Sequence, residues 1–387
     1  MDKLLKKYND KLVEQGLCEE GQPLICGLDD NLVWNRSDPL CSILEEVVAS
    51  LNINSLLFAK PSRGYFSILN YLTKDKPGAI YPQDCETRTF LHDIPVAVEL
   101  DADKIIEALK RRKSIVVRDR GIVTFGIVSV EQAFIVYSSV CFAAFVKFFT
   151  DFLYAVRENK VDSTQQDIFL NAVKVYEDFL QKIKFVPSYE GPFDSAEVVI
   201  KAMIEAAKFT VDSRMVDSFF GNISYRLADT IYVSQTASSL DELAGCIDPC
   251  PLDESSCAGA TASSEYVAHR DIFLTTQALA ILHGHPKFSV IMSMVCNEKE
   301  CKSRGLCHIK CPKKRSIADI PIVPGEVGTG PYGLCKTLPA AVKGKRGAIV
   351  YGHGLFTVGK RDFKDAFANL VDIEKACFRE YLDRVKN

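Results

Sequence analysis

The histidines of the C-terminal third are the residues in this chain whose spacing best suits metal chemistry. His283 and His285 stand two residues apart at the end of an apolar run, 273–282. In an extended segment, side chains at i and i+2 leave the same face, so both imidazoles can reach one ion. His353, between two glycines after a second apolar run, would complete a three-histidine site with one open position. The alternative is that all three are ordinary polar residues of loops.

The composition narrows the class of protein that must position these residues. The chain has 387 residues and a net charge of -3, with 47% hydrophobic and 25% charged residues. Such a chain is long enough for two or three domains and is not expected to bind nucleic acid. The N-terminus has no apolar signal region, so the fourteen cysteines favour a reducing, cytoplasmic compartment. The apolar segment 134–156 is broken by Lys147 and Asp151. Its uncharged part is well short of the ~20 residues of a membrane span, so we expect a helix buried between domains or subunits.

A pattern of helix, strand, turn and strand occurs twice along the chain. Without gaps, four residues of the first half fall opposite four of the second: Gly121, Thr124, Gly126 and Phe134 opposite Gly354, Thr357, Gly359 and Phe367. Further upstream, 66–69 resembles 288–291, which places Pro61 and Arg63 opposite His283 and His285. On this comparison Arg120 faces His353, so the first copy has none of the three histidines. A chance match of common strand and turn patterns is the alternative to an internal repeat.

The repeat predicts two related domains. We expect an N-terminal helical segment at 1–29, a shortened, metal-free domain at 30–158, a helical linker at 159–193 and a complete domain at 194–387.

Several short motifs of the second domain accompany the histidines. They are Gly221-Asn222-Ile223-Ser224, Thr236-Ala237 and Ser263-Ser264-Glu265, the last with the pattern of a helix N-cap. Taken singly, each indicates a turn, a loop or a cap. Taken in order with His283, His285 and His353, they resemble the class II aldolase/adducin family, of the fuculose-phosphate aldolase type. The resemblance extends over 194–387 and, in degenerate form, over the first domain, so we expect a tandem duplication.

The resemblance implies a fold, a metal site and a chemistry. The expected fold is α/β, with three-layer α/β/α domains around a central, mainly antiparallel sheet. The metal, expected to be zinc, would bind to His283, His285 and His353, with Glu265 as the acid/base. Such a metal accepts the oxygens of a ketose and stabilises its enediolate while Glu265 moves the proton. Four residues would bind the substrate, in the family a sugar phosphate: Asn222, Thr236, Ser263 and Ser264.

The resemblance also bears on the reaction and on the assembly. Glu265 is typical of the family's aldolases and of its methylthioribulose-phosphate dehydratases, whereas the epimerases have Asp. The prediction is therefore a metal-dependent lyase that cleaves or condenses a small hydroxy-carbonyl or sugar-phosphate substrate. A dehydratase, or an adducin-like binding module without catalysis, is the alternative. Family enzymes form four-fold tetramers, so two fused copies would form a homodimer that is a pseudo-tetramer. Phe219 and Ala237 depart from the family, in which a small hydroxyl residue and a glycine are usual.

Two further groups of residues invite a functional interpretation. An insertion at 296–315 contains four thiols within a short loop, Cys296, Cys301, Cys307 and Cys311. They are suited to bind a structural zinc or an iron-sulfur cluster. The alternative is that these cysteines are reduced or paired in disulfides. The first domain has three arginines near the place where the second domain is expected to hold its metal: Arg63, Arg118 and Arg120. They would bind an anion or pair with neighbouring aspartates.

Overall fold

The computed structural model describes residues 1–386 apart from 75–77, 185, 218–219, 299 and 327–328. The chain divides into two compact units, Met1–Gln181 and Lys182–Asn387. Phe219, one of the two departures from the family pattern, lies outside the described residues.

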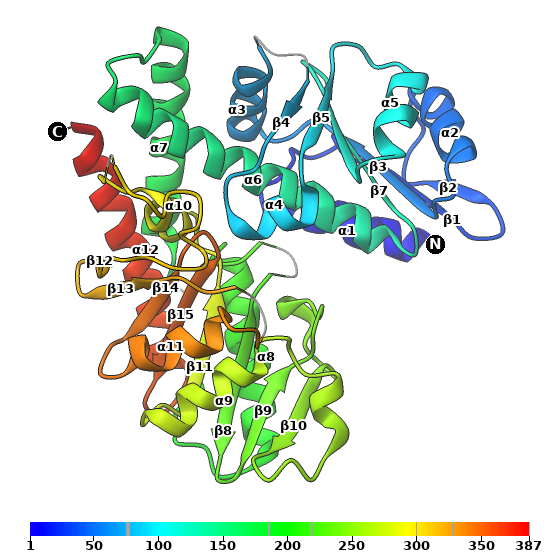
Figure 1. The fold of residues 1–387 in the computed structure, drawn as a ribbon. Helices are drawn as coiled ribbons and strands as arrows, with labels where there is room; N and C mark the ends of the chain where they lie inside the picture. The colour runs from blue at the N-terminus through cyan, green and yellow to red at the C-terminus, as the bar shows by residue number, and fades with distance from the viewer. Residues whose placement is uncertain (75–77, 185, 218–219, 299, 327–328, 387) are drawn as a thin grey trace. The chain divides into compact units, whose positions relative to one another are not determined.

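The first unit is a mainly antiparallel sheet with helices on both faces (Figure 1). Its strands run in the order β2-β1-β3-β7-β6-β5-β4. They are β1 (Leu24–Leu28), β2 (Leu32–Trp34), β3 (Ser55–Ala59), β4 (Ala79–Ile80), β5 (Ile94–Ala97), β6 (Ser114–Val117) and β7 (Gly121–Gly126). The helices are α1 (Asp2–Glu14), α2 (Cys41–Ser50), α3 (Arg63–Thr73), α4 (Cys85–Leu91), α5 (Ala102–Leu109), α6 (Val130–Arg157) and α7 (Ser163–Lys182). Because α1 and β1 precede residue 30 and pack within this unit, the fold begins earlier than the expected boundary.

Helix α6 explains the apolar segment of the first half. Within the described residues it is the one helix that is long and apolar enough to cross a membrane, yet 89% of its most apolar window is buried. It packs on β3 and β7 and against α1, α3 and α4. The first unit's own core therefore accounts for its apolar character.

The second unit has the same layered architecture (Figure 1). Its strands run in the order β10-β9-β8-β11-β15-β14-β13-β12. They are β8 (Asn222–Leu227), β9 (Thr230–Ser234), β10 (Ile247–Pro251), β11 (Ala280–Gly284), β12 (Arg315–Ile317), β13 (Ile320–Val323), β14 (Gly347–Val350) and β15 (Gly354–Gly359). The helices are α8 (Ala196–Asp212), α9 (Tyr266–Thr275), α10 (Lys287–Met294), α11 (Leu334–Val342) and α12 (Phe363–Lys386), with short 3₁₀ turns η1 (Leu240–Glu242) and η2 (Cys257–Ala260). Helices α9 and α11 cover one face, and α8, α10 and α12 lie on the other.

The two sheets have the same topology. Without β10, each position in one strand order has its counterpart in the other, from β2 and β9 at one end to β4 and β12 at the other. In each sheet one pair is parallel, β5 with β6 and β13 with β14, and the remaining pairs are antiparallel. Local contacts agree as well, since the Oγ1 atoms of Thr124 and Thr357 each donate to a carbonyl nine residues further on, at 2.8 Å.

Strand registers correct the expected match between the halves. Ser55 pairs with Gly126 as Ala280 pairs with Gly359. These two pairs make Ser55 of β3 equivalent to Ala280 of β11. Three residues further along each strand, Phe58 is equivalent to His283, and Lys60 is in turn equivalent to His285. Pro61 and Arg63, which were expected there, come three residues too late in the chain. The similarity between 66–69 and 288–291 is thus one of helix composition, because both segments lie in helices that follow these strands.

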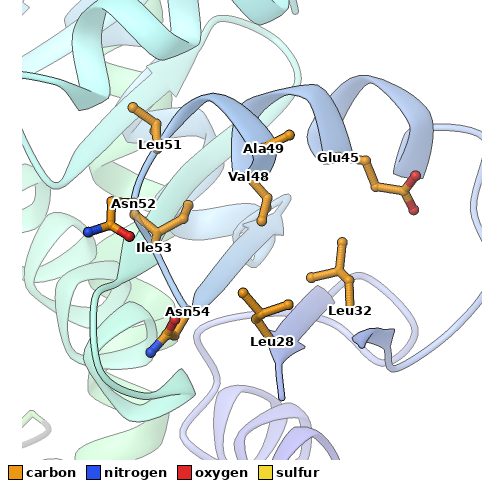
Figure 2. A pocket seen from close by; sticks show the side chains of 9 residues that line it. All are labelled: Leu28, Leu32, Glu45, Val48, Ala49, Leu51, Asn52, Ile53 and Asn54. Carbon is orange, nitrogen blue, oxygen red and sulfur yellow. The ribbon is translucent and has the colours of Figure 1, made fainter. Parts of the chain in front are cut away.

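A pocket of about 580 Å³ opens in the first unit between α2 and the β1–β2 hairpin. Figure 2 shows Leu28, Leu32 and Val48 turned toward it. Its one ionisable lining residue, Glu45, accepts a hydrogen bond from the Trp34 indole. The pocket therefore offers a single carboxylate and no set of acid/base partners or metal ligands.

Candidate metal centre

Three histidines of the second unit converge at one end of its sheet. His283 is in β11, His285 follows that strand, and His353 lies in the turn between β14 and β15. Their ligand nitrogens all lie within 4.8 Å of one another, and each residue is at most 4% exposed. The strand brings His283 and His285 to one face, and the hairpin turn brings His353 beside them from a distant part of the sequence.

Hydrogen bonds indicate which nitrogen of His283 faces the centre. Its Nδ1 lies 3.2 Å from the carbonyl oxygen of Leu355, so Nδ1–H donates there and the Nε2 lone pair is directed inward. This Nε2 lies 3.0 Å from Nε2 of His285. Burial lowers the pKa of His283 to about 3, so the ring is neutral at neutral pH. Neutral imidazole is the form that binds a metal.

Close aromatic packing holds these rings in place. The ring of Phe356, in β15, stacks on His283 with centroids 3.8 Å apart and an angle of 11°. On the other side, Phe220 stacks against His285 at 5.7 Å. Gly354 is required in the turn, because a Cβ there would lie 2.5 Å from the carbonyl oxygen of Gly284 and 2.7 Å from the ring of His283.

Glu265 brings a buried carboxylate to the same place. Its Oε1 lies 2.9 Å from Nε2 of His353, and its Oε2 accepts a hydrogen bond of 2.7 Å from Nδ2 of Asn222. Burial raises the pKa of Glu265, but nearby His283 and the hydrogen bonds from His353 and Asn222 outweigh this effect and hold it below its usual range. Because His283 is itself neutral, we attribute the ionised state of Glu265 mainly to the hydrogen bonds.

The structure corrects the expected N-cap at 263–265. Helix α9 begins at Tyr266, and its N-cap residue Glu265 makes no side-chain capping bond. The carboxylate is turned toward the histidines instead, while the backbone N–H of Glu265 donates to Ser263 Oγ at 3.3 Å. A capping pattern in the sequence therefore marked a catalytic candidate.

The expected substrate-binding residues come from adjoining segments. Ser263 N–H donates to Ser234 at the end of β9, and Thr236 N–H donates to Thr261, which brings 234–236 and 261–263 side by side. Ser263 is buried, whereas Thr236 and Ser264 are exposed. The Oδ1 atom of Asn222 is buried and has no hydrogen-bond partner in the structure, so it is suited to accept a hydrogen bond from a ligand hydroxyl.

Ala237 is one of the two departures from the family pattern, and its backbone conformation shows why glycine suits this position. Its φ of 56° lies in the left-handed region, which favours glycine. The glycine usual at this position is thus a backbone requirement, and Ala237 meets it at a cost.

The cysteines of the insertion do not form a comparable group. Among the described residues, the structure brings together only the three histidines as a set with metal-ligand spacing. Cys296, Cys301, Cys307 and Cys311 are all free thiols and are not gathered around a common point. The second metal site at these cysteines stays a prediction, because the structure does not bring the four thiols to metal-ligand spacing.

The three arginines of the first unit differ in their surroundings. Arg118 donates to the carbonyl oxygen of Thr73, while Arg63 and Arg120 are exposed. Arg112, not one of these three, pairs with Asp93.

Sequence analysis assigned no role to Ser224 of the first motif and did not single out His269, and both are buried in the second unit. Ser224 and His269 are hydrogen bonded to each other behind Glu265, at 2.6 Å. The only signal in the sequence was the spacing of His269 four residues after Glu265, which places both on one side of a helix.

The donor set fits a divalent metal. Three imidazoles beside a carboxylate match the ligands of catalytic zinc sites that keep an open position. Two inward Nε2 atoms at 3.0 Å would repel each other unless a proton or a cation lies between them. The cluster therefore has the chemistry of a cation site.

Comparison with known proteins finds a family match within the second unit. Residues 201–381 match the family described as Class II Aldolase and Adducin N-terminal domain. This match supports the class II aldolase family for the second unit, and the first unit lies outside the matched residues. No curated protein matches the chain.

Several solved structures are similar to about half of the chain. L-fuculose-1-phosphate aldolase from Thermus thermophilus is 18% identical, with 48% of this chain and 95% of that chain covered and a TM-score of 0.38. A sugar-phosphate aldolase from Thermotoga maritima is 18% identical, with coverages of 48% and 94% and a TM-score of 0.36. The N-terminal class II aldolase domain of a conserved protein from Thermoplasma acidophilum is 15% identical, with coverages of 51% and 99% and a TM-score of 0.34. At these values the likeness carries nothing about the substrate of this chain.

Proposed function

We propose that the second unit is a metal-dependent lyase of the class II aldolase type, which cleaves or forms a carbon–carbon bond in a small hydroxy-carbonyl or sugar-phosphate substrate. The observation that carries the proposal is the convergence of three imidazoles and one ionised carboxylate in a buried site. The family match over 201–381 supports it.

His283, His285 and His353 would hold the metal, and zinc is the ion that this donor set favours. When bound, the metal supplies a Lewis acid for the carbonyl oxygen of the substrate. His353 Nε2 cannot both donate to Glu265 and bind a cation, so loading would leave Asn222 as the donor that holds the carboxylate.

Glu265 is the proposed acid/base. Its carboxylate is ionised, so it is ready to accept a proton from the carbon next to a carbonyl group or from a hydroxyl group, and to return that proton later. Asn222 orients this carboxylate through Nδ2, while its Oδ1 remains available for a substrate hydroxyl. Ser263, Ser264 and Thr236 are the proposed donors to the rest of the substrate, including a phosphate if it carries one.

Metal analysis together with a proton-exchange assay tests this proposal. We expect purified protein to bind one zinc per chain and to exchange the α-protons of dihydroxyacetone or of its phosphate with D₂O, as followed by NMR. His283→Ala should lose the metal, and Glu265→Gln should keep the metal but lose the exchange. Glu254→Gln, a change at an exposed carboxylate, is the matched control. Wild-type protein that binds no metal, or that exchanges no proton when loaded, would favour the adducin-like alternative.

We further propose that the two units are copies of one ancestral domain, of which the first has lost its metal site. The shared strand order, the single parallel pair in each sheet and the matching threonine bonds support this view. At the places of the histidines the first unit has Phe58, Lys60 and Arg120, which do not form a metal site. As a homodimer, such a chain would contribute four related units, and light scattering would distinguish this assembly from a monomer.

A further inference from the structure

Ser224 and His269 form a buried pair that the proposed reaction does not use. The Ser224 Oγ and His269 Nδ1 atoms are 2.6 Å apart, and both residues are fully buried. The other ring nitrogen of His269, Nε2, has no hydrogen-bond partner in the structure. Burying an unpartnered polar group is unfavourable, so packing alone does not explain a histidine at this position.

The pair repeats the geometry of the bond that holds Glu265. Asn222 and Ser224 are two residues apart in β8, so their side chains leave the same face of the sheet. Glu265 and His269 are four residues apart at the start of α9 and lie on one side of the helix. The bonds Asn222–Glu265 and Ser224–His269 are therefore two neighbouring rungs between β8 and α9. Because Glu265 is the N-cap residue, the position of its carboxylate depends on the first turn of the helix.

The first unit has equivalent positions for the Asn222–Glu265 and Ser224–His269 pairs. The β1–β3 register places Leu24 and Cys26 where β8 has Asn222 and Ser224. Helices α2 and α9 end at the same distance before β3 and β11, which places Leu40 and Leu44 where the second unit has Glu265 and His269.

In the first unit these four positions are apolar. Leu24, Cys26 and Leu44 lie in the hydrophobic core, and Leu40 packs against it. The fold of the first unit therefore forms with apolar side chains at both pairs of positions. The polar rungs occur in the unit that has the histidine cluster, so they serve the site and not the architecture.

We propose that His269, held by Ser224, is a positioning residue that fixes the first turn of α9 and so holds the Glu265 carboxylate beside His283 and His353. The ring of His269 also meets Phe356 edge-on at 5.8 Å, and Phe356 stacks on His283. One buried histidine therefore braces both the acid/base and a metal ligand. This inference rests on the proposed role of Glu265.

Four variants test the inference. His269→Leu removes the rung, and the double variant Ser224→Cys with His269→Leu copies the apolar pair Cys26 and Leu44, so it is expected to fold. His269→Asn retains a side-chain partner for Ser224. His308→Leu replaces a histidine of the insertion and is the matched control.

The first readout needs neither metal nor substrate. In metal-free protein, hydrogen exchange of the backbone amides at 263–269, measured by mass spectrometry, should become about tenfold faster in His269→Leu, as expected for the loss of one buried hydrogen bond. His269→Asn should restore most of the protection, and His308→Leu should match the wild type. Equal exchange rates in His269→Leu and wild type would overturn the inference, whether or not the protein is an enzyme.

The second readout uses the proton exchange of dihydroxyacetone or its phosphate by zinc-loaded protein. Misplacing the carboxylate should lower kcat by about 100-fold in the leucine variants with KM and zinc content unchanged. The primary deuterium isotope effect should rise, because proton transfer becomes slower than the other steps. A loss caused only by misfolding would lower the zinc content and leave the isotope effect unchanged, which would contradict the positioning role. If the wild type exchanges no proton, the proposed function fails, and the metal-free readout still decides the inference.

Discussion

Glu374 offers a sharp test of how α10 and the adjoining histidine are held. This residue of α12 is fully buried, and its carboxylate accepts three hydrogen bonds at the start of α10. The donors are the backbone N–H of Phe288 at 2.7 Å, the backbone N–H of Ser289 at 2.8 Å and the Ser289 hydroxyl at 2.7 Å. Helix α10 begins two residues after His285, so this carboxylate anchors the turn that directs His285 inward.

We expect Glu374→Gln to destabilise the second unit by about 3 to 5 kcal/mol. The amide oxygen of Gln accepts at one side, but its NH₂ group faces donors at the other. Hydrogen bonds to a charged group contribute about 1.5–3 kcal/mol each, and at least one buried N–H or O–H loses its acceptor. The loss of a negative charge at a helix N-terminus adds to the effect.

Hydrogen exchange in increasing urea, followed by mass spectrometry, measures this change on peptides of α10 and α12. Glu380→Gln is the matched control, because this glutamate lies on the same helix in a partly exposed pair with Arg384. Zinc affinity should fall in Glu374→Gln, since the turn at His285 loses its anchor. The reasoning is refuted if Glu374→Gln unfolds in the second unit at the same urea concentration as Glu380→Gln.

Three other predictions concern stability and metal content. Burial raises the pKa of Asp84 from 3.8 to about 6, so the stability that its protonated form contributes is full below pH 3.8 and is lost as the pH rises to about 6. Asp84→Asn should remove that loss, about 3 kcal/mol at neutral pH, in urea titrations from pH 4 to pH 8; an unchanged pH dependence would contradict it. Ala237→Gly should stabilise the second unit by about 1 kcal/mol in thermal unfolding, because its φ of 56° strains alanine; a lower Tm would count against that reading. Cys301→Ser should leave the zinc content at one per chain by elemental analysis, and the loss of a second metal would show that the insertion binds one.

The sequence predicted the candidate site more accurately than the relation between the two halves. His283 and His285 share one face because strand alternation is a local property. His353 joins them through the pairing of β11 with β15, which the order of the motifs in the family resemblance indicated and local spacing did not. The residue-by-residue match of β3 with β11 depends on how each strand pairs in its own sheet, β3 with β7 and β11 with β15. These partner strands are distant in sequence. A similar helix composition at 66–69 and 288–291 therefore led to a match three residues out of place.

His269 and the cysteines show two limits of the sequence pattern. A single histidine in a helix has no recognisable pattern until β8 is known to supply Ser224 opposite it. The four cysteines of 296–315 have a pattern in sequence, but they are free thiols outside the one set with metal-ligand spacing among the described residues, so their metal site stays a prediction. Helix α6 was identified as buried, and only the contacts with β3 and β7 showed which core contains it.

The common topology of the two sheets has a consequence for the order of events in the cell. The first unit completes the same strand arrangement with Phe58, Lys60 and Arg120 at the places of the histidines, so this architecture closes without any contribution from an ion. A zinc finger, by contrast, folds only as it acquires its metal. Under the proposed function, the second unit would be a scaffold that can be synthesised and folded first and supplied with an ion afterwards, and its activity would follow metal availability without turnover of the protein.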